Sequence, residues 1–143
     1  MQKILVSSCL LGDNCRYDGK NNLIEDIAVL KDKYKIVKFC PEEAGGLKTP
    51  RSPSEIQGEK IVNAEGEDVT EYFKRGAELA LKKCMEENIK IAILKERSPS
   101  CGSDFVYDGT FSGQMVGSMG VTAQLLKNNG IWVLNEYNYK EVL

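Results

Sequence analysis

Three short apolar runs in the sequence have the composition of buried β-strands, and each is followed by a cysteine. Segments with a helical pattern lie between them, so strands and helices alternate along the chain. Such alternation favours a mostly parallel sheet with helices on both faces. The three pairs are residues 3–8 with Cys9, residues 35–39 with Cys40, and residues 89–94 with Cys101.

Three further stretches have the apolar spacing of helices. The second of them follows a capping box, with Asp68 as N-cap and Glu71 reaching back. Because Cys84 shares the apolar stripe of this helix, we interpret it as a core residue. The third helix ends in an Asn-Asn-Gly stop signal and leads to a final strand at residues 131–134. The stripes are Leu23, Ile27, Leu30 and Tyr34; Phe73, Ala77, Ala80 and Cys84; and Val121, Leu125 and Leu126.

The connecting segments are rich in turn-forming residues. Residues 40–53 contain three prolines and two glycines, which predicts no regular structure there. Residues 60–64 are compatible with a short strand. Residues 95–118 form a long irregular segment in which residues 107–110 have the pattern of a tight hairpin turn. Irregular segments of this length in compact domains are usually functional or disordered.

The position of the first strand decides where the cysteines meet. With the strand order 2-1-3-4 the first strand would lie inside the sheet, and the three cysteines would gather at the carboxyl edge, where open α/β sheets bind ligands. The sequence therefore predicts one three-layer, Rossmann-like α/β domain over residues 1–143, with Cys9, Cys40 and Cys101 at strand C-terminal ends.

A proline and a glycine shape the turn around the third cysteine. Pro99 removes a backbone donor, and Gly102 frees the backbone just after the thiol. We therefore expect residues 96–102 to form a rigid turn that presents Cys101 together with the hydroxyls of Ser98 and Ser100.

Composition limits the classes of partner and chemistry. The net charge of −2, from 19 basic and 21 acidic residues, gives no electrostatic reason to expect a nucleic-acid polymer or an anionic membrane as partner. No apolar run has the length of about 20 residues that a membrane helix needs, and no signal-peptide pattern opens the chain. We therefore expect a cytoplasmic protein whose five cysteines bind metal or act in catalysis rather than form disulfides.

Histidine is absent from the chain. Proton transfer near neutral pH must therefore use carboxylates, thiols, hydroxyls or metal-bound water, and a metal site must use thiolate and oxygen ligands. Glu42 and Glu43, close to Cys40, are candidates for a general base. Arg51 is a candidate for steadying an anionic substrate. The glycine-rich segment near residue 110 lacks the ending of a phosphate-binding loop.

Three convergent thiols allow three kinds of site. An iron–sulfur cluster is held by cysteine thiolates, usually four. A zinc site could use Cys15 as a fourth ligand, although the close-paired cysteines typical of structural zinc are missing. A nucleophilic or redox cysteine usually needs a base or a resolving partner nearby.

Four motifs spread over the chain contain these cysteines. They are Ser8-Cys9-Leu10-Leu11-Gly12 with Cys15-Arg16-Tyr17-Asp18-Gly19; Cys40-Pro41-Glu42 with Gly45-Gly46 and Pro50-Arg51; Lys95-Glu96-Arg97-Ser98-Pro99-Ser100-Cys101-Gly102; and Tyr107-Asp108-Gly109-Thr110-Phe111 with Gly117. Together they resemble a bacterial family formerly catalogued as a domain of unknown function and now associated with thiouracil desulfidase activity.

The resemblance implies a [4Fe-4S] cluster held by Cys9, Cys40 and Cys101, of a kind that aerobic purification can strip. Its open iron would take up sulfur from a small thiolated base such as thiouracil, in a non-redox reaction that yields the oxo base and sulfide. Motif by motif, the resemblance also implies roles for other residues. Cys15, Glu42 and Ser98 would lie beside the open iron as catalytic groups, and the neighbouring Glu43 and Ser100 are the alternatives. As substrate-binding residues we expect Arg51 and Ser100.

Two alternative functions use the same thiols. One is a zinc-thiolate hydrolase, and the other is a redox or iron sensor whose cluster reports without turnover. The sequence does not specify an oligomeric state.

Overall fold

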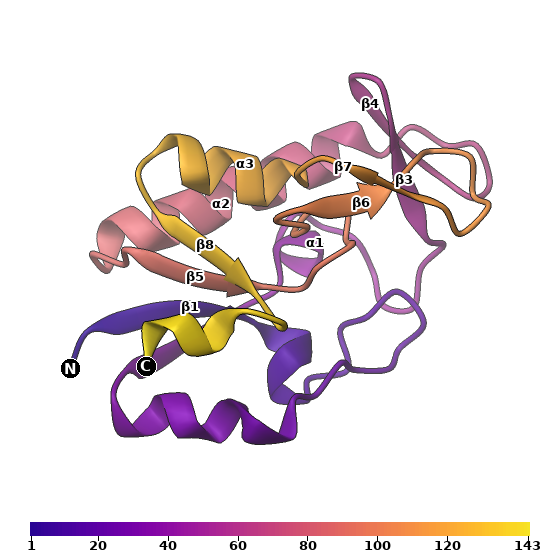
Figure 1. The fold of residues 1–143 in the computed structure, drawn as a ribbon. Coiled ribbons are helices and arrows are strands. Elements are labelled where there is room, and N and C mark those ends of the chain that lie inside the picture. The colour runs from indigo at the N-terminus through magenta and orange to yellow at the C-terminus, as the bar shows by residue number, and fades with distance from the viewer.

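A four-stranded parallel sheet forms the centre of the computed structural model, which describes residues 1–143 (Figure 1). Strand β1 pairs with β2 on one side and with β5 on the other, and β5 pairs with β8. The predicted order, with the first strand inside the sheet, is confirmed. The strands, in spatial order, are β2 (Lys35–Phe39), β1 (Lys3–Ser7), β5 (Ile91–Leu94) and β8 (Trp132–Asn135).

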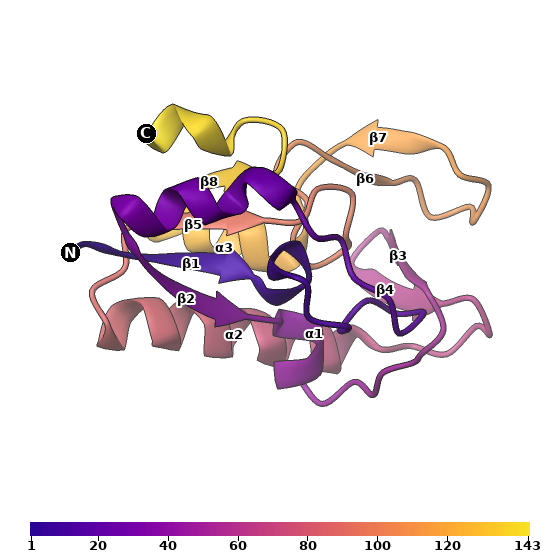
Figure 2. The same ribbon diagram turned by 90° about the horizontal axis from the view of Figure 1, so that it is seen from below.

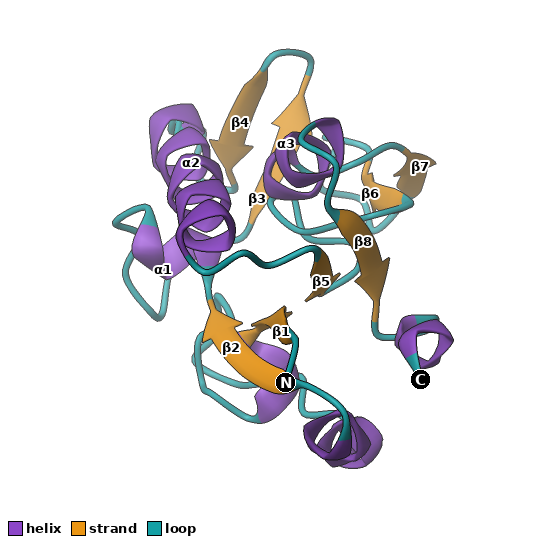
Figure 3. Ribbon diagram, turned by 90° about the vertical axis from the view of Figure 1, so that its left-hand side faces the viewer, coloured by secondary structure: helices purple, strands orange, loops and turns teal.

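Helices cover both faces of the sheet, as predicted (Figure 3). They are α2 (Thr70–Glu86) and α3 (Val121–Asn128) on one face, and the 3₁₀-helices η2 (Glu25–Asp32) and η3 (Tyr139–Val142) on the other. Successive side chains of a strand point to opposite faces. Leu5 of β1 therefore packs in the core under α2 and α3, whereas Ile4 and Val6 pack in the core under η2 and η3. No helix has both the length and the apolar character needed to cross a membrane.

The first predicted helix is a 3₁₀-helix and is shorter than its stripe. Ile27, Leu30 and Tyr34 are buried, as the spacing indicates, but Leu23 is 54% exposed. The N–H of Leu23 donates to the Asn21 side chain, and the backbone of the next residue is still extended, so the helix has not begun there. The expected capping box is also wrong in detail, because α2 begins at Thr70. Asp68 forms an isolated bridge with Val62 and accepts bonds from the N–H and hydroxyl of Thr70, while the Glu71 side chain makes no capping bond.

Two segments just past strands are more regular than predicted. The run expected at residues 3–8 ends at Ser7, and a 3₁₀-helix, η1 (Ser8–Leu11), carries Cys9. The segment 40–53, for which no regular structure was expected, contains the short helix α1 (Pro41–Ala44). Pro41 occupies the first helical position, where its fixed φ and missing N–H favour a helix rather than break it.

Two antiparallel hairpins lie beyond the carboxyl end of the sheet. The strand expected at residues 60–64 is present as β4, but its partner β3 was not predicted. The tight turn expected at residues 107–110 is wrong, since residues 108–114 form a longer connection. The strand pairs are β3 (Ser54–Gln57) with β4 (Lys60–Asn63), and β6 (Phe105–Tyr107) with β7 (Met115–Gly117).

Two glycines allow α1 to pack backbone to backbone on α2. A Cβ at Gly76 of α2 would lie 2.0 Å from the carbonyl oxygen of Pro41, and a Cβ at Gly45 would lie 2.0 Å from the carbonyl oxygen of Tyr72. Any side chain at either position would therefore push the helices apart. Because Cys40 directly precedes α1, this close approach also sets the position of Cys40.

Gly76→Ala is expected to lower the free energy of unfolding by about 1–3 kcal/mol, because the added methyl group must displace α1. Chemical denaturation followed by circular dichroism measures this change. Gly117→Ala is the matched control, since nothing lies within 4 Å of a Cβ at that position. Equal stability of both variants would show that the α1–α2 contact yields easily.

Cys84→Ala is expected to cost about 1 kcal/mol of stability and to leave any iron bound by the protein in place. Cys84 is buried in the core under α2 and α3, together with Ala80, and burial raises the pKa of its thiol to about 11. Thermal unfolding and iron analysis of the two proteins check this prediction. Loss of iron from the variant would contradict the interpretation of Cys84 as a core residue.

Candidate metal centre and active-site pocket

Strands β1, β2 and β5 point toward the same end of the molecule, where the loops gather (Figure 2). A pocket of about 510 Å³ opens there. Side chains from both hairpins and from the loops after these strands line it. Four of the five cysteines are among the lining residues: Cys9, Cys15, Cys40 and Cys101.

The three cysteines proposed as ligands reach the pocket from three adjacent strands. Cys9 lies in η1 just past β1, and Cys40 directly follows β2. Cys101 lies in the loop that follows β5 and is buried. The expectation that the three thiols occupy neighbouring strand ends is confirmed.

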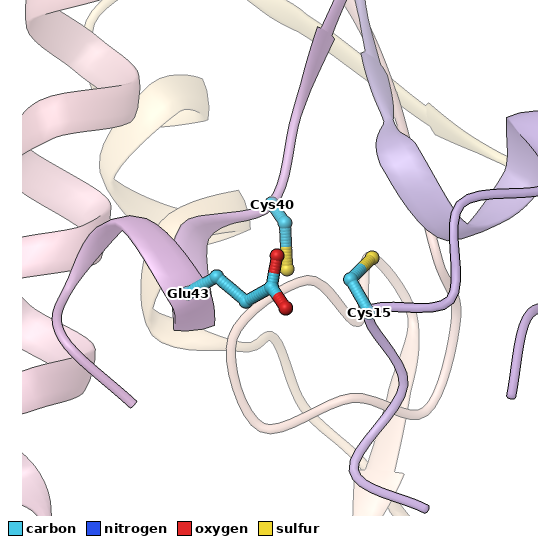
Figure 4. A group of neighbouring side chains, drawn as sticks. All are labelled: Cys15, Cys40 and Glu43. Carbon is cyan, nitrogen blue, oxygen red and sulfur yellow. The ribbon is translucent and has the colours of Figure 1, made fainter. Parts of the chain in front are cut away.

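The fourth thiol, Cys15, lies beside those of Cys9 and Cys40. Its sulfur, the Cys40 sulfur and a carboxylate oxygen of Glu43 lie within 4.8 Å of one another (Figure 4). A hydrogen bond from Cys15 lowers the pKa of Cys9 to about 7 and also lowers the pKa of Cys40. The same two neighbours raise the pKa of Cys15. Cys9 and Cys40 are therefore the thiols of this group that most readily become thiolates, the form that binds metal.

Cys101 is held in a tight turn. Its N–H donates to the Ser98 hydroxyl at 3.1 Å, and the Ser7 hydroxyl donates to its sulfur at 3.8 Å. Burial raises the pKa of this thiol. Ser100, expected to contact substrate, is fully buried, and its hydroxyl lies 2.7 Å from that of Thr122. Ser100 therefore lies behind Cys101, outside the pocket wall.

Glu42 faces the pocket, whereas Glu43 does not line it. One carboxylate oxygen of Glu42 accepts a bond from the Ser98 hydroxyl at 3.3 Å, and the other accepts one from Arg51 Nε at 3.3 Å. Burial raises the pKa of Glu42, and the charge of Arg51 opposes this effect. Glu43 is exposed and accepts a bond from the hydroxyl of Thr49, although its carboxylate lies beside the sulfurs of Cys15 and Cys40. The two carboxylates that the sequence left as alternatives therefore have different surroundings.

Arg51 joins the loops around the pocket. Besides Glu42, its guanidinium donates to the carbonyl oxygens of Cys15 at 2.9 Å and Lys48 at 3.2 Å, and to the Thr49 hydroxyl at 2.8 Å. Its side chain is 9% exposed. These bonds engage every donor-bearing nitrogen of the guanidinium, so Arg51 mainly fixes Glu42 and the Cys15 loop.

The hairpin β6–β7 supplies an aromatic wall that the sequence reasoning left without a role. Tyr107 and Phe111 both line the pocket. The N–H groups of Gly109 and Phe111 donate to the buried carboxylate of Glu55 in β3, at 3.0 and 3.1 Å. Both aromatic residues belong to a motif seen in the sequence. Glu55 reaches this loop from strand β3, which was not predicted, so its role could not be inferred from the sequence.

Comparison with known proteins agrees with this geometry. The family model described as 2-thiouracil desulfurase matches residues 4–138. YbbK, an uncharacterized protein of Bacillus subtilis (strain 168), is 49% identical over an alignment of 150 positions. The alignment covers 98% of this chain and 99% of YbbK. A solved structure of TudS, a [4Fe-4S]-dependent thiouracil desulfidase, matches with a TM-score of 0.94 at 47% identity and covers 99% of this chain and 95% of that chain. The chain therefore belongs to the 2-thiouracil desulfurase family.

Proposed function

We propose that the chain is a [4Fe-4S]-dependent desulfidase that converts a small thiolated base such as thiouracil to the oxo base. The observation that carries this proposal is the meeting of Cys9, Cys40 and Cys101 in one pocket that also contains Glu42. Water supplies the new oxygen and sulfur leaves as sulfide. The reaction therefore needs neither an oxidant nor a reductant.

The residues of the pocket fit a cluster with three protein ligands. Cys9, Cys40 and Cys101 come from three separate segments, and no histidine competes with them. Clusters usually have four cysteine ligands, so three would leave one iron free for another molecule. The bound cluster would supply a Lewis acid for the thiocarbonyl sulfur.

Glu42 has the surroundings of a general base. The Ser98 hydroxyl and the Arg51 guanidinium each bond to one of its carboxylate oxygens and fix its orientation. In our proposal a Glu42 oxygen takes the proton of the water that attacks the thiocarbonyl carbon. Cys15 would border the reacting atoms beside Cys9 and Cys40 without serving as a ligand.

The pocket suits a flat heterocycle. Tyr107 and Phe111 provide aromatic surface, and a ring can pack against such surface over its whole face.

We propose a free small molecule rather than a nucleic-acid polymer as substrate, because the net charge of −2 favours no polyanion. Since the site requires reduced thiols, we also propose a cytoplasmic location. That residues 1–143 form a single domain remains a prediction.

One observation favours the zinc alternative. Cys15, Cys40 and Glu43 bring two thiol sulfurs and a carboxylate oxygen within 4.8 Å of one another, which suits a single small ion. Metal analysis of anaerobically purified protein separates the two functions, because a cluster gives iron, sulfide and broad visible absorption, whereas zinc gives none of these.

Replacing any one of Cys9, Cys40 or Cys101 with serine is expected to abolish most cluster binding, because a hydroxyl is a far poorer iron ligand than a thiolate. Cys15→Ala should instead keep the iron and turn over slowly. Iron and sulfide content after anaerobic reconstitution measures the difference, with Cys84→Ala as the control thiol outside the pocket. If Cys15→Ala loses as much iron as the others, Cys15 is a fourth ligand and the proposed open iron does not exist.

Glu42→Gln is expected to keep the cluster and slow turnover of thiouracil about 10²–10⁴-fold, because the amide cannot accept a proton from water. Single-turnover kinetics on fully loaded, anaerobic protein measures this step. Glu43→Gln is the matched control and should behave like the parent. The opposite pattern would assign the role to Glu43, and parent-like rates for both variants would refute a carboxylate base.

A further inference from the structure

Besides Glu55, a second buried carboxylate that lines the pocket takes no part in the proposed reaction. Glu96 follows β5 in the motif that contains Cys101, and it is 3% exposed. No lysine or arginine side chain forms an ion pair with it. Lys95, its neighbour, pairs with Glu136 at 2.8 Å instead. Burying a carboxylate without hydrogen-bond or charged partners costs free energy, so the partners of Glu96 indicate its role.

The loop that carries Cys101 closes around this carboxylate. Oxygen Oε1 of Glu96 accepts hydrogen bonds from four backbone N–H groups, and such a nest of N–H dipoles stabilises an anion. These N–H groups belong to residues before and after Cys101 in the chain, so one oxygen holds both arms of the loop together. The donors are Arg97 at 3.2 Å, Ser103 at 2.9 Å, Asp104 at 3.2 Å and Phe105 at 3.2 Å.

The second oxygen attaches the loop to the edge of the sheet. Oε2 accepts a bond from the Asn135 side-chain amide at 2.9 Å and from the Ser103 hydroxyl at 3.3 Å. Asn135 is buried at the end of β8, and its side-chain oxygen Oδ1 accepts hydrogen bonds from the N–H groups of Tyr137 and Asn138. Glu96 therefore joins the ends of β5 and β8 to the cysteine loop.

The loop has a backbone shape that requires such support. Arg97 adopts φ +72°, which is uncommon for a residue with a side chain. At Gly102 a Cβ would lie 2.5 Å from the carbonyl oxygen of Phe105, so the two arms of the loop touch there. Without the Glu96 carboxylate, the N–H groups of Ser103, Asp104 and Phe105 would lose this acceptor, whereas the N–H of Arg97 would keep the carbonyl oxygen of Phe105 at 3.2 Å.

We propose that Glu96 is a positioning residue that shapes residues 97–105 so that Cys101 and Ser98 face the pocket. The N–H of Cys101 donates to the Ser98 hydroxyl, which in turn donates to Glu42. One carboxylate outside the reaction thus sets both a proposed ligand and the hydroxyl that orients the proposed base. This inference rests on the proposed function for the meaning of the two positions, but the shape of the loop can be tested without it.

The first test is Glu96→Gln, which keeps the size of the side chain but removes its charge. The new side-chain NH₂ group would face the NH₂ group of Asn135, so two donors would meet where a donor and an acceptor meet in the parent. In the protein without cluster, we expect the amides of Ser103, Asp104 and Phe105 to exchange with solvent about tenfold faster or more. In the reconstituted protein, we expect about tenfold faster or greater loss of iron to a chelator. The electron paramagnetic resonance spectrum of the reduced cluster should also change, since the geometry at Cys101 changes.

A second substitution provides a rescue. Adding Asn135→Asp to Glu96→Gln gives the new amide an acceptor in place of the facing donor. The double variant should recover part of the amide protection and of the iron retention. Glu55→Gln is the matched control, because this buried carboxylate also holds two backbone N–H groups, on a loop that carries no cysteine. It should retain iron at the rate of the parent.

The outcomes separate this inference from the proposed function. If Glu96→Gln folds, protects the three amides and releases iron like the parent, the inference is overturned. If that variant does not fold, Asn135→Ala replaces it, and unchanged protection of residues 103–105 there overturns the inference equally. If the parent protein binds no cluster, the proposed function fails, while the exchange rates of the apoprotein still decide whether Glu96 shapes the loop.

Discussion

The parallel pairing of β1 with β2 and with β5 is the constraint on which the site depends. Parallel strands all end at the same edge of a sheet, so segments that are far apart in the chain begin their loops side by side. Cys9 and Cys40 use this directly, within two residues of a strand end. Cys101 lies further along the chain and needs additional support. The arrangement explains how a chain without histidine gathers several thiols in one pocket.

Buried carboxylates provide that additional support. Glu55 holds the loop with the aromatic residues, and Glu96 holds the loop with Cys101, each through backbone N–H groups. Such bonds place a loop without adding bulk to the pocket. All three carboxylates line the pocket, but Glu42 differs from the other two because its partners are side chains alone. Position and partners, rather than residue type, therefore distinguish supporting carboxylates from the proposed base.

The sequence predicts most of the fold and the cysteine positions, because both follow from short-range patterns. Apolar runs identified the central strands, and their alternation with helices indicated a parallel sheet. The errors occurred where a local sequence rule was overridden by the surrounding structure. Pro41 was expected to prevent regular structure but begins α1, and Asp68 was expected to cap α2 but pairs with β4 instead.

The supporting residues were harder to predict for a different reason. The carboxylate of Glu96 bonds mainly to backbone N–H groups up to nine positions away, and every residue type except proline has such a group. The sequence therefore carries no complementary side chain that would mark the interaction. Arg51 shows the converse: its charge suggested contact with an anionic substrate, but each of its guanidinium nitrogens donates to another group of the protein.

The close packing of α1 on α2 has a consequence for the order of events during maturation. Cys40 is positioned by backbone contact between helices, and Cys101 by hydrogen bonds within its own loop. Both contacts are made between parts of the protein itself. Contacts within the protein therefore offset part of the conformational entropy that is lost when these loops become ordered. A chain built in this way can fold first and accept a preassembled cofactor afterwards, whereas a small zinc finger is unfolded until its metal binds.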